Sequence, residues 1–125
     1  MKILIVDDSP MDRKLLTALL KKAKVTNEIL EAQDGQKGLD MLREQYRDIG
    51  LILLDWQMPR MDGLEFMHLS RKDPALAAIP IIMVTSAWAD EQKRIAQMIN
   101  PDLAGYVVKP FKAEALMGKI KPYLR

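Results

Sequence analysis

Five short apolar runs, separated by segments whose apolar residues recur at helical spacing, constrain this chain more than any other feature of its sequence. The runs are Ile3–Val6, Ile29–Leu30, Leu51–Leu54, Ile79–Val84 and Tyr106–Val108. Apolar strands that alternate with amphipathic helices indicate a parallel sheet that is covered on both faces and joined by right-handed crossovers. We therefore predict an α/β fold, in which residues 1–125 form a single doubly wound domain.

The first helix is predicted directly after the first strand. Ser9 is a favoured N-cap residue, Pro10 fits the first helical turn, and Asp12 occupies the acidic position of a capping box. Four further helices are predicted at Gly35–Gln45, Gly63–Arg71, Asp90–Ile99 and Lys112–Tyr123. Pro74 and Pro101 are expected to act as stops after the third and fourth helices.

Composition excludes several classes of protein. The chain has no cysteine and His68 is its only histidine, which excludes disulfides, thiolate metal sites and catalysis by several imidazoles. A net charge of +2 is too small to indicate direct nucleic-acid binding. No apolar run approaches the roughly 18 residues of a membrane span, and the N-terminus lacks the pattern of a secretory signal. We expect a cytoplasmic protein without membrane insertion.

Polar side chains follow four of the predicted strands at the point where each strand ends. They are Asp7 and Asp8 after the first strand, Asp55 after the third, Thr85 and Ser86 after the fourth, and Lys109 and Pro110 after the fifth. Ligands of open parallel sheets bind beyond the carboxyl ends of the strands. Because neighbouring strands lie about 4.8 Å apart, three carboxylates converge if the first and third strands are adjacent.

Converging carboxylates repel one another by a few kcal/mol at a surface-like dielectric constant, and either a hard divalent cation or an ammonium group relieves this repulsion. We predict that Mg²⁺ and Lys109 supply both. An Asp-Asp pair alone is equally expected as a turn or helix cap. A strand-end carboxylate together with a metal, a lysine and a hydroxyl group is the set that phosphoryl transfer needs, so Asp55 is a candidate nucleophile.

Four ordered motifs resemble the receiver domain of two-component response regulators. The motifs are Ile5–Ser9, Leu54–Gly63, Val84–Ala87 and Tyr106–Phe111, and the resemblance runs from Lys2 to the final helix. It implies a flavodoxin-like fold with a five-stranded parallel sheet in the order 2-1-3-4-5 and five helices. It also implies a signalling domain that catalyses its own phosphorylation and dephosphorylation, and not a metabolic enzyme.

The resemblance also implies the roles of the acidic residues. Asp55 would accept a phosphoryl group from a histidine kinase or a histidine phosphotransfer protein. Asp8 would bind Mg²⁺ directly and Asp7 would hold it through water. The carboxylate of Asp55 and the backbone carbonyl of Gln57 would complete the protein ligands, and Mn²⁺ would be able to replace Mg²⁺.

Three further residues would form the switch by the same resemblance. Thr85 would hydrogen-bond the phosphoryl oxygens, Lys109 would pair with them, and Tyr106 would swing inward. The family holds the bond between Lys109 and Pro110 in the cis form. The surface of the fourth helix, fifth strand and fifth helix would report the change to a downstream partner. Taken alone, Thr85 is also explained as a β-branched strand residue and Tyr106 as a half-buried core aromatic.

Three other classes fit the sequence less well. A haloacid-dehalogenase-like phosphatase requires a second aspartate where this chain has Gln57. A flavin-binding domain requires a glycine- and hydroxyl-rich loop where this chain has the acidic segment 7–10. A constitutive interaction module would lack the acceptor aspartate or the lysine, and this chain has both.

Within the family, Trp56 and the run Gly105–Phe111 look most like the single-domain chemotaxis regulator that binds the flagellar motor switch. The alternatives are a phosphorelay intermediate and a receiver excised from a longer regulator with a DNA-binding or enzymatic output. The end at Arg125 without a linker favours a free-standing domain, although an excised domain could end in the same way.

Two features depart from the family pattern or leave its chemistry open. The segment 98–105 lacks the Gly-Ala pair that commonly closes the fourth helix, and Pro101 is expected to end that helix sharply. Gln57 and Ala87 flank the site at positions that tune dephosphorylation in the family, so the sequence predicts no phosphoryl lifetime.

Overall fold

The structure is a computed structural model that describes residues 1–86 and 90–124, so Ala87 and Trp88 lie outside the described residues. Across these two ranges, five strands form one parallel sheet in the order β2-β1-β3-β4-β5, as predicted. The strands are β1 (Lys2–Val6), β2 (Ile29–Ala32), β3 (Ile49–Leu54), β4 (Ile81–Thr85) and β5 (Gly105–Val108). Four of the predicted runs lie entirely within these strands. The fourth strand begins at Ile81 instead of Ile79.

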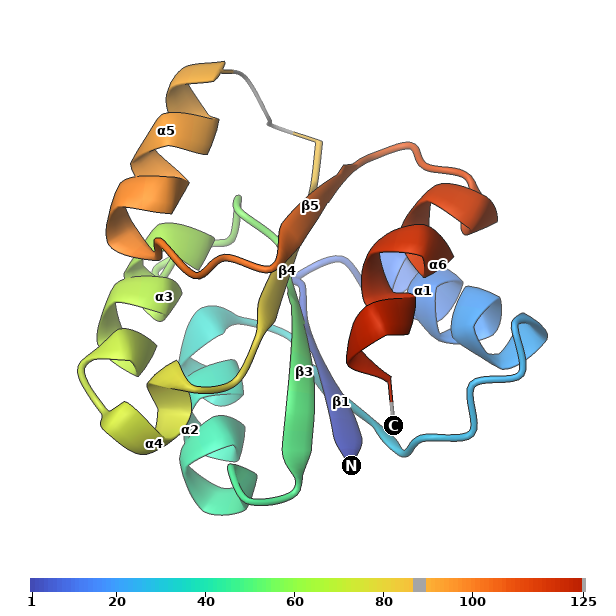
Figure 1. The fold of residues 1–125 in the computed structure, drawn as a ribbon, viewed down its shortest axis with the longest axis horizontal. Coiled ribbons are helices and arrows are strands. Elements are labelled where there is room, and N and C mark those ends of the chain that lie inside the picture. The colour runs from blue at the N-terminus through green and yellow to red at the C-terminus, as the bar shows by residue number, and fades with distance from the viewer. Residues whose placement is uncertain (87–89, 125) are drawn as a thin grey trace.

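Helices cover both faces of this sheet (Figure 1). The helices are α1 (Pro10–Lys22), α2 (Gly35–Gln45), α3 (Gly63–Arg71), α4 (Pro74–Ala77), α5 (Asp90–Ile99) and α6 (Ala113–Ile120), followed by the 3₁₀ turn η1 (Lys121–Tyr123). Helices α1 and α6 lie on one face, and α2, α3, α4 and α5 lie on the other. The predicted bounds of α2, α3 and α5 are confirmed.

Two helical details differ from the prediction because of proline. Pro74 does follow the end of α3, but it also occupies the first turn of the short helix α4, where the side chain of Asp73 caps the N–H of Ala75. Pro122 lacks a backbone N–H, and the predicted last helix ends as the 3₁₀ turn η1 around it.

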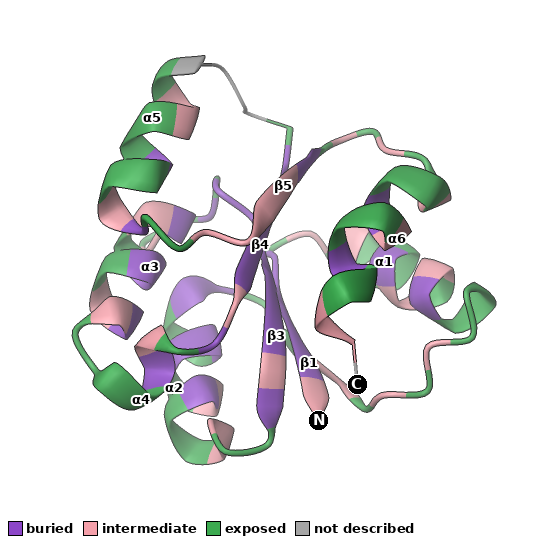
Figure 2. Ribbon diagram, viewed as in Figure 1, coloured by how far each residue is buried: buried purple, intermediate pink, exposed green. Residues whose placement is uncertain are grey.

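The central strands are buried on both sides, which explains their uninterrupted apolar sequences (Figure 2). Side chains of Leu16 and Leu116 pack with alternate residues of the strands under α1 and α6. Leu39 and Phe66 belong to the second core, under α2, α3, α4 and α5. The two cores hold the sheet rigidly, so residues that follow the strands are fixed in position.

The start of α1 confirms the N-cap and corrects the capping box. Ser9 Oγ accepts a hydrogen bond of 3.2 Å from the Asp12 N–H, as expected of an N-cap. The Ser9 N–H, however, donates to Asp7 Oδ1, and the Asp12 carboxylate accepts from Lys109 Nζ. Aspartate is shorter than the glutamate that usually closes a capping box, and an ammonium is the stronger donor.

Asn100 ends α5 at the predicted place and links it to α3. Its side chain is almost fully buried, and Oδ1 accepts hydrogen bonds from Arg71 Nη1 at 2.8 Å and from the Asp102 N–H at 3.1 Å. The Asn100 N–H donates to the Ala96 carbonyl. The departure from the family pattern in segment 98–105 therefore contains a buried polar link between the ends of two helices.

Replacing Asn100 by alanine is expected to lower the free energy of unfolding by about 1–3 kcal/mol, because two partly buried hydrogen bonds lose their buried acceptor. Urea unfolding measures this change. Asp102→Ala is the matched control and should cost less than about 1 kcal/mol, because the Asp102 carboxylate is highly exposed and 3.8 Å from Arg71. Equal losses in the two variants would contradict a structural role for the Asn100 side chain.

Candidate functional site

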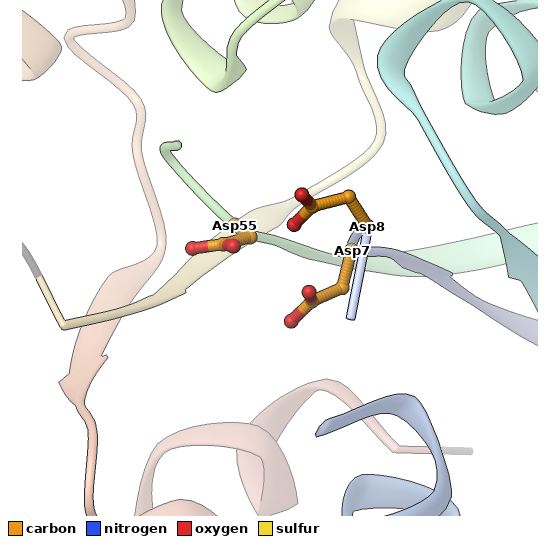
Figure 3. A group of neighbouring side chains, drawn as sticks. All are labelled: Asp7, Asp8 and Asp55. Atoms are coloured by element: carbon orange, nitrogen blue, oxygen red, sulfur yellow. The ribbon is translucent and has the colours of Figure 1, made fainter. Parts of the chain in front are cut away.

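The carboxyl ends of the strands bring the predicted polar residues together. Strands β1 and β3 are adjacent, with Val6 opposite Leu54, so the residues that follow them meet at one edge of the sheet. Carboxylate oxygens of Asp7, Asp8 and Asp55 lie within 4.8 Å of one another (Figure 3). The predicted convergence of three carboxylates is confirmed.

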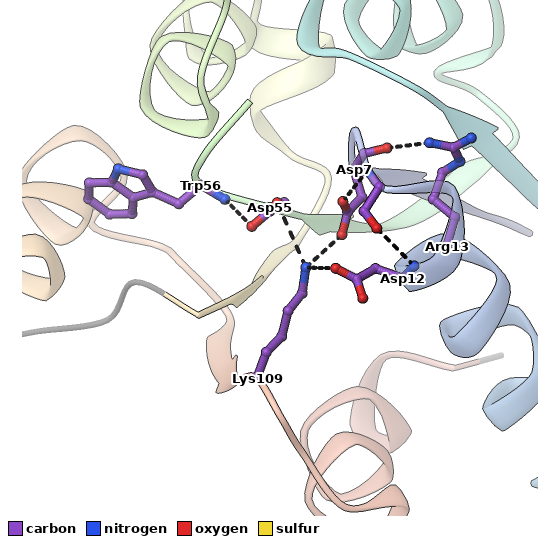
Figure 4. Close-up of polar contacts among 7 residues, drawn as sticks. Asp7, Asp12, Arg13, Asp55, Trp56 and Lys109 are labelled. Carbon is purple, nitrogen blue, oxygen red and sulfur yellow. Dashed lines mark hydrogen bonds and ion pairs between the residues drawn. The ribbon is translucent and has the colours of Figure 1, made fainter. Parts of the chain in front are cut away.

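Hydrogen bonds that involve backbone groups hold the buried residues Asp7 and Asp55 in place. The Asp55 N–H donates to the Val6 carbonyl at 2.9 Å, which continues the sheet by one residue. Arg13 Nη1 donates to the Asp7 carbonyl at 2.7 Å and ties the first turn of α1 to the end of β1. Asp55 Oδ1 accepts from the Trp56 N–H at 2.8 Å, so this oxygen is held on the side away from Lys109 (Figure 4).

Gly63 allows α3 to start against the backbone of the site. Its N–H donates to the Trp56 carbonyl at 2.8 Å. A Cβ atom at this position would lie 2.5 Å from the Asp55 carbonyl oxygen, closer than a side chain tolerates. Glycine is required here by close approach, because its backbone adopts no left-handed conformation.

Lys109 places its ammonium group among three carboxylates. The distances from Nζ are 2.8 Å to Asp7 Oδ2, 2.9 Å to Asp12 Oδ2 and 3.7 Å to Asp55 Oδ2 (Figure 4). The peptide bond between Lys109 and Pro110 is cis, as the resemblance implies. The predicted meeting of Lys109 with Asp7 and Asp55 is confirmed.

Sequence reasoning missed Asp12 as a member of this site. It assigned the residue only to the helix cap, and no motif quoted above includes it. The available signal was the position of Asp12 in the first turn of α1, which starts directly beyond the Asp7-Asp8 pair. Its partner Lys109 lies 97 residues further along the chain, so no local pattern could have shown the contact.

Burial dominates the electrostatics of the site. Burial and then the charge of Asp7 raise the pKa of Asp55 from 3.8 to about 6, although Lys109, the Trp56 N–H and a hydrogen bond with Thr85 oppose this rise. Burial alone would lower the pKa of Lys109, but hydrogen bonds to Asp7 and Asp12 and the charge of Asp55 raise it above its ordinary value. Negative charge exceeds positive charge here, which favours a bound cation.

Replacing Asp55 by asparagine is expected to raise the free energy of unfolding by about 1–3 kcal/mol at neutral pH in EDTA. Because the pKa is raised in the folded protein from 3.8 to about 6, the folded state binds more protons than the unfolded chain between these values. Wild-type stability should therefore fall as pH rises through this interval, and the asparagine variant should lack this loss.

Urea unfolding of both proteins at several pH values tests this difference. The stabilisation should disappear at a pH below both pKa values of Asp55, because wild-type Asp55 is then neutral in both states. Mg²⁺ should also narrow the difference at neutral pH by binding the folded wild type. A variant that is less stable than wild type at neutral pH would contradict the argument.

The site opens on a pocket of about 480 Å³. Its lining comprises Asp8, Asp12, Leu15, Leu16, Asp55, Gln57, Ser86, Lys109, Pro110 and Phe111. Asp8 is exposed and Asp55 is buried, so one carboxylate faces water while another is shielded. Mg²⁺ prefers hard oxygen ligands and usually keeps several water ligands. The clustered carboxylates supply such oxygens, and the pocket gives water access to them. The donor set therefore fits Mg²⁺, and the part of Gln57 as a ligand stays a prediction.

A switch would need to connect Asp55 with the surface around β5, and Thr85 and Tyr106 lie at these two places. Thr85 is fully buried at the end of β4, and its side chain hydrogen-bonds Asp55. Tyr106 in β5 is half-buried, with Lys93 Nζ 3.5 Å from its hydroxyl oxygen and Lys119 Nζ 5.7 Å from its ring centroid. The inward movement of Tyr106 stays a prediction.

Comparison with known proteins assigns the class that this fold and acidic edge define. Residues 3–121 match the response regulator receiver domain, and the chain belongs to this family. It is 39% identical over 121 residues to the chemotaxis protein CheY of Pseudomonas aeruginosa, which covers 97% of this chain and 94% of that relative. It is 37% identical over 120 residues to chemotaxis protein CheY-3 of Vibrio cholerae, which covers 96% and 88%.

Solved structures agree with the sequence relatives. The chemotaxis protein CheY4 of Vibrio cholerae superposes with a TM-score of 0.86 at 30% identity, and the alignment covers 98% of each chain. The chain is therefore a receiver domain similar to chemotaxis proteins of the CheY type. None of the helices described in ranges 1–86 and 90–124 is long and apolar enough to cross a membrane.

Proposed function

We propose that this protein is a phosphorylation-activated switch of a two-component system, in which residues 1–125 act as one receiver domain in the cytoplasm. Asp55 accepts a phosphoryl group from a histidine kinase or a histidine phosphotransfer protein in a Mg²⁺-dependent reaction. The domain catalyses this transfer and the later hydrolysis of the phosphoryl group, in which water is the acceptor and inorganic phosphate is released. The observation that carries the proposal is the meeting of Asp7, Asp8, Asp55 and Lys109 at one strand-end edge.

The geometry supports attack by one oxygen of Asp55. Oδ1 is engaged by the Trp56 N–H, while Oδ2 faces Lys109 at 3.7 Å. Oδ2 attacks the phosphorus atom, the bond from phosphorus to the donor histidine nitrogen breaks, and the electron pair stays with the imidazole. A pKa of about 6 leaves Asp55 mostly ionised at neutral pH, as a nucleophile must be.

The residues around Asp55 stabilise the charge that develops during transfer. Asp8, Asp55 and the Gln57 carbonyl would hold Mg²⁺ directly, and Asp7 would hold it through water; Mn²⁺ would be able to replace it. The cation would supply positive charge next to the phosphoryl oxygens. Lys109, which follows the carboxyl end of β5, supplies the second positive charge. This division of labour fits the mainly electrostatic character of phosphoryl transfer.

The switch follows from new contacts to the phosphoryl group. Thr85 and Lys109 move toward it and Tyr106 turns inward. The surface of α5, β5 and α6, which are the predicted fourth helix, fifth strand and fifth helix, then changes. This surface already exposes apolar side chains to a partner, because Met98 is 80% and Val108 is 42% exposed. The phosphoryl contacts shift a pre-existing equilibrium between two arrangements of this surface.

The downstream role that we propose is chemotaxis, with the flagellar motor switch as the target. Its support is the likeness to relatives that are chemotaxis proteins. A phosphorelay intermediate and the receiver of a longer regulator are the alternatives. A chemotaxis regulator should bind purified motor-switch protein more tightly when phosphorylated, whereas a relay intermediate should pass its phosphoryl group to a second histidine protein.

Trp56 provides the test of the proposed function, because its side chain is largely buried and its backbone N–H donates a hydrogen bond to Asp55 Oδ1. In a Trp88→Phe protein, Mg²⁺ should change Trp56 fluorescence and acetyl phosphate should extend the change. The same protein carrying Asp55→Asn is the control and should show no response to acetyl phosphate. No response in either protein would contradict a phosphorylation switch.

A further inference from the structure

Asp12 and Asp55 share one ammonium group. Lys109 Nζ lies 2.9 Å from Asp12 Oδ2, within hydrogen-bond distance, but 3.7 Å from Asp55 Oδ2. Figure 4 shows the two carboxylates on different sides of this ammonium. The shorter contacts thus hold Lys109 toward Asp7 and Asp12, and the weaker contact is the one to Asp55.

Among the residues that the structure describes, Lys109 is the only hydrogen-bond or ion-pair partner of the Asp12 carboxylate. The N-cap bond of α1 uses the backbone N–H of Asp12 and the hydroxyl of Ser9. The side chain of Asp12 is 38% exposed, whereas that of Lys109 is only 14% exposed. Asp12 therefore reaches from the pocket rim to an ammonium that is shielded from water.

A phosphoryl group on Asp55 would compete with Asp12 for the same ammonium. An ammonium has three N–H donors, and in this structure its two shortest contacts are to Asp7 and Asp12. Movement of Lys109 toward a new anion on Asp55 lengthens its contact to Asp12, because the two anions lie on different sides. The free energy of the resting contact opposes the switched state.

We propose that Asp12 is a positioning residue that retains Lys109 in the resting arrangement and thereby weakens the binding of a phosphoryl group at Asp55. This inference rests on the proposed role of Asp55 and adds a restraint to it. Because Asp12 is partly exposed, the restraint should be worth about a three- to tenfold change in affinity.

The affinity for beryllofluoride, a stable phosphoryl mimic, measures this restraint directly. It is titrated in saturating Mg²⁺ while Trp56 fluorescence is followed in the Trp88→Phe protein. Asp12→Asn should bind beryllofluoride about three- to tenfold more tightly than the parent protein. Asp12→Glu keeps the charge and should return the affinity toward that of the parent. Glu44→Gln removes an exposed carboxylate from α2 and is the matched charge control, without effect.

A double-mutant cycle separates positioning of Lys109 from simple charge repulsion. If Asp12 acts through Lys109, Asp12→Asn should change the affinity less than about twofold in a Lys109→Ala background. Repulsion between Asp12 and the anion would persist in that background at full size, and this result would overturn the inference. An effect of Glu44→Gln equal to that of Asp12→Asn would also overturn it.

The same titration distinguishes the inference from the function on which it rests. If the parent protein binds beryllofluoride and Asp12→Asn binds it equally or more weakly, the restraint by Asp12 is wrong while the phosphoryl site stands. If the parent protein and Asp12→Asn both fail to bind beryllofluoride in Mg²⁺, the proposed function and the inference fail together.

Discussion

Asp55→Asn should lower phosphoryl uptake about 100-fold or more, because an amide oxygen is a poor nucleophile where a carboxylate is required. Asparagine has nearly the shape of aspartate, and its oxygen can still accept the Trp56 N–H that now donates to Asp55 Oδ1. The variant should therefore fold normally, and the loss should be chemical. Radiolabelled acetyl phosphate in the presence of Mg²⁺ measures the uptake.

Asp48→Asn is the matched control for this loss. Asp48 is an exposed aspartate next to the opposite end of β3, so the same substitution there leaves the acidic edge intact. Its uptake should equal that of the wild type. Wild-type uptake by Asp55→Asn would show that another residue accepts the phosphoryl group.

The second large effect is expected from Lys109→Ala, which should keep Mg²⁺ binding but lose switching. The carboxylates of Asp7, Asp8 and Asp55 remain in this variant, so the cation site is retained. The charge-assisted contact of Lys109 to the phosphoryl group, worth about 1.5–3 kcal/mol, is lost, which reduces the ratio of switched to resting protein by more than about tenfold.

Amide NMR shifts in α5, β5 and α6 measure this ratio when beryllofluoride is added in Mg²⁺. The wild type should show shifts across this surface, and Lys109→Ala should show them only around Asp55. Lys112→Ala, which removes an exposed lysine just before α6, is the matched control and should behave as wild type. Full shifts in Lys109→Ala would remove this residue from the switch.

The sheet could be predicted because its physical signal is local. A strand segment buried on both faces must be apolar at every position, and the segments Ile3–Val6 of β1 and Leu51–Leu54 of β3 show this in their sequences. Helix α4 carried no such signal, because four residues make only one turn and cannot display a helical period. Pro74 was also ambiguous, since proline both follows helices and starts them.

The acidic site was predictable to the extent that topology places it. Adjacent parallel strands bring Asp7, Asp8 and Asp55 to one edge wherever the side chains point. The contact of Asp12 with Lys109 depends on side-chain conformations and on packing between α1 and the segment after β5, so residue patterns could not reveal it. The link from Arg71 to Asn100 was missed for the same reason.

Intact-mass measurement of the wild-type protein after incubation with acetyl phosphate tests the central claim most directly. The proposal predicts the mass of one added phosphoryl group when Mg²⁺ is present and none in EDTA, with peptide mapping that locates the group on Asp55. No added mass in Mg²⁺, or a phosphoryl group on a residue other than Asp55, would contradict it.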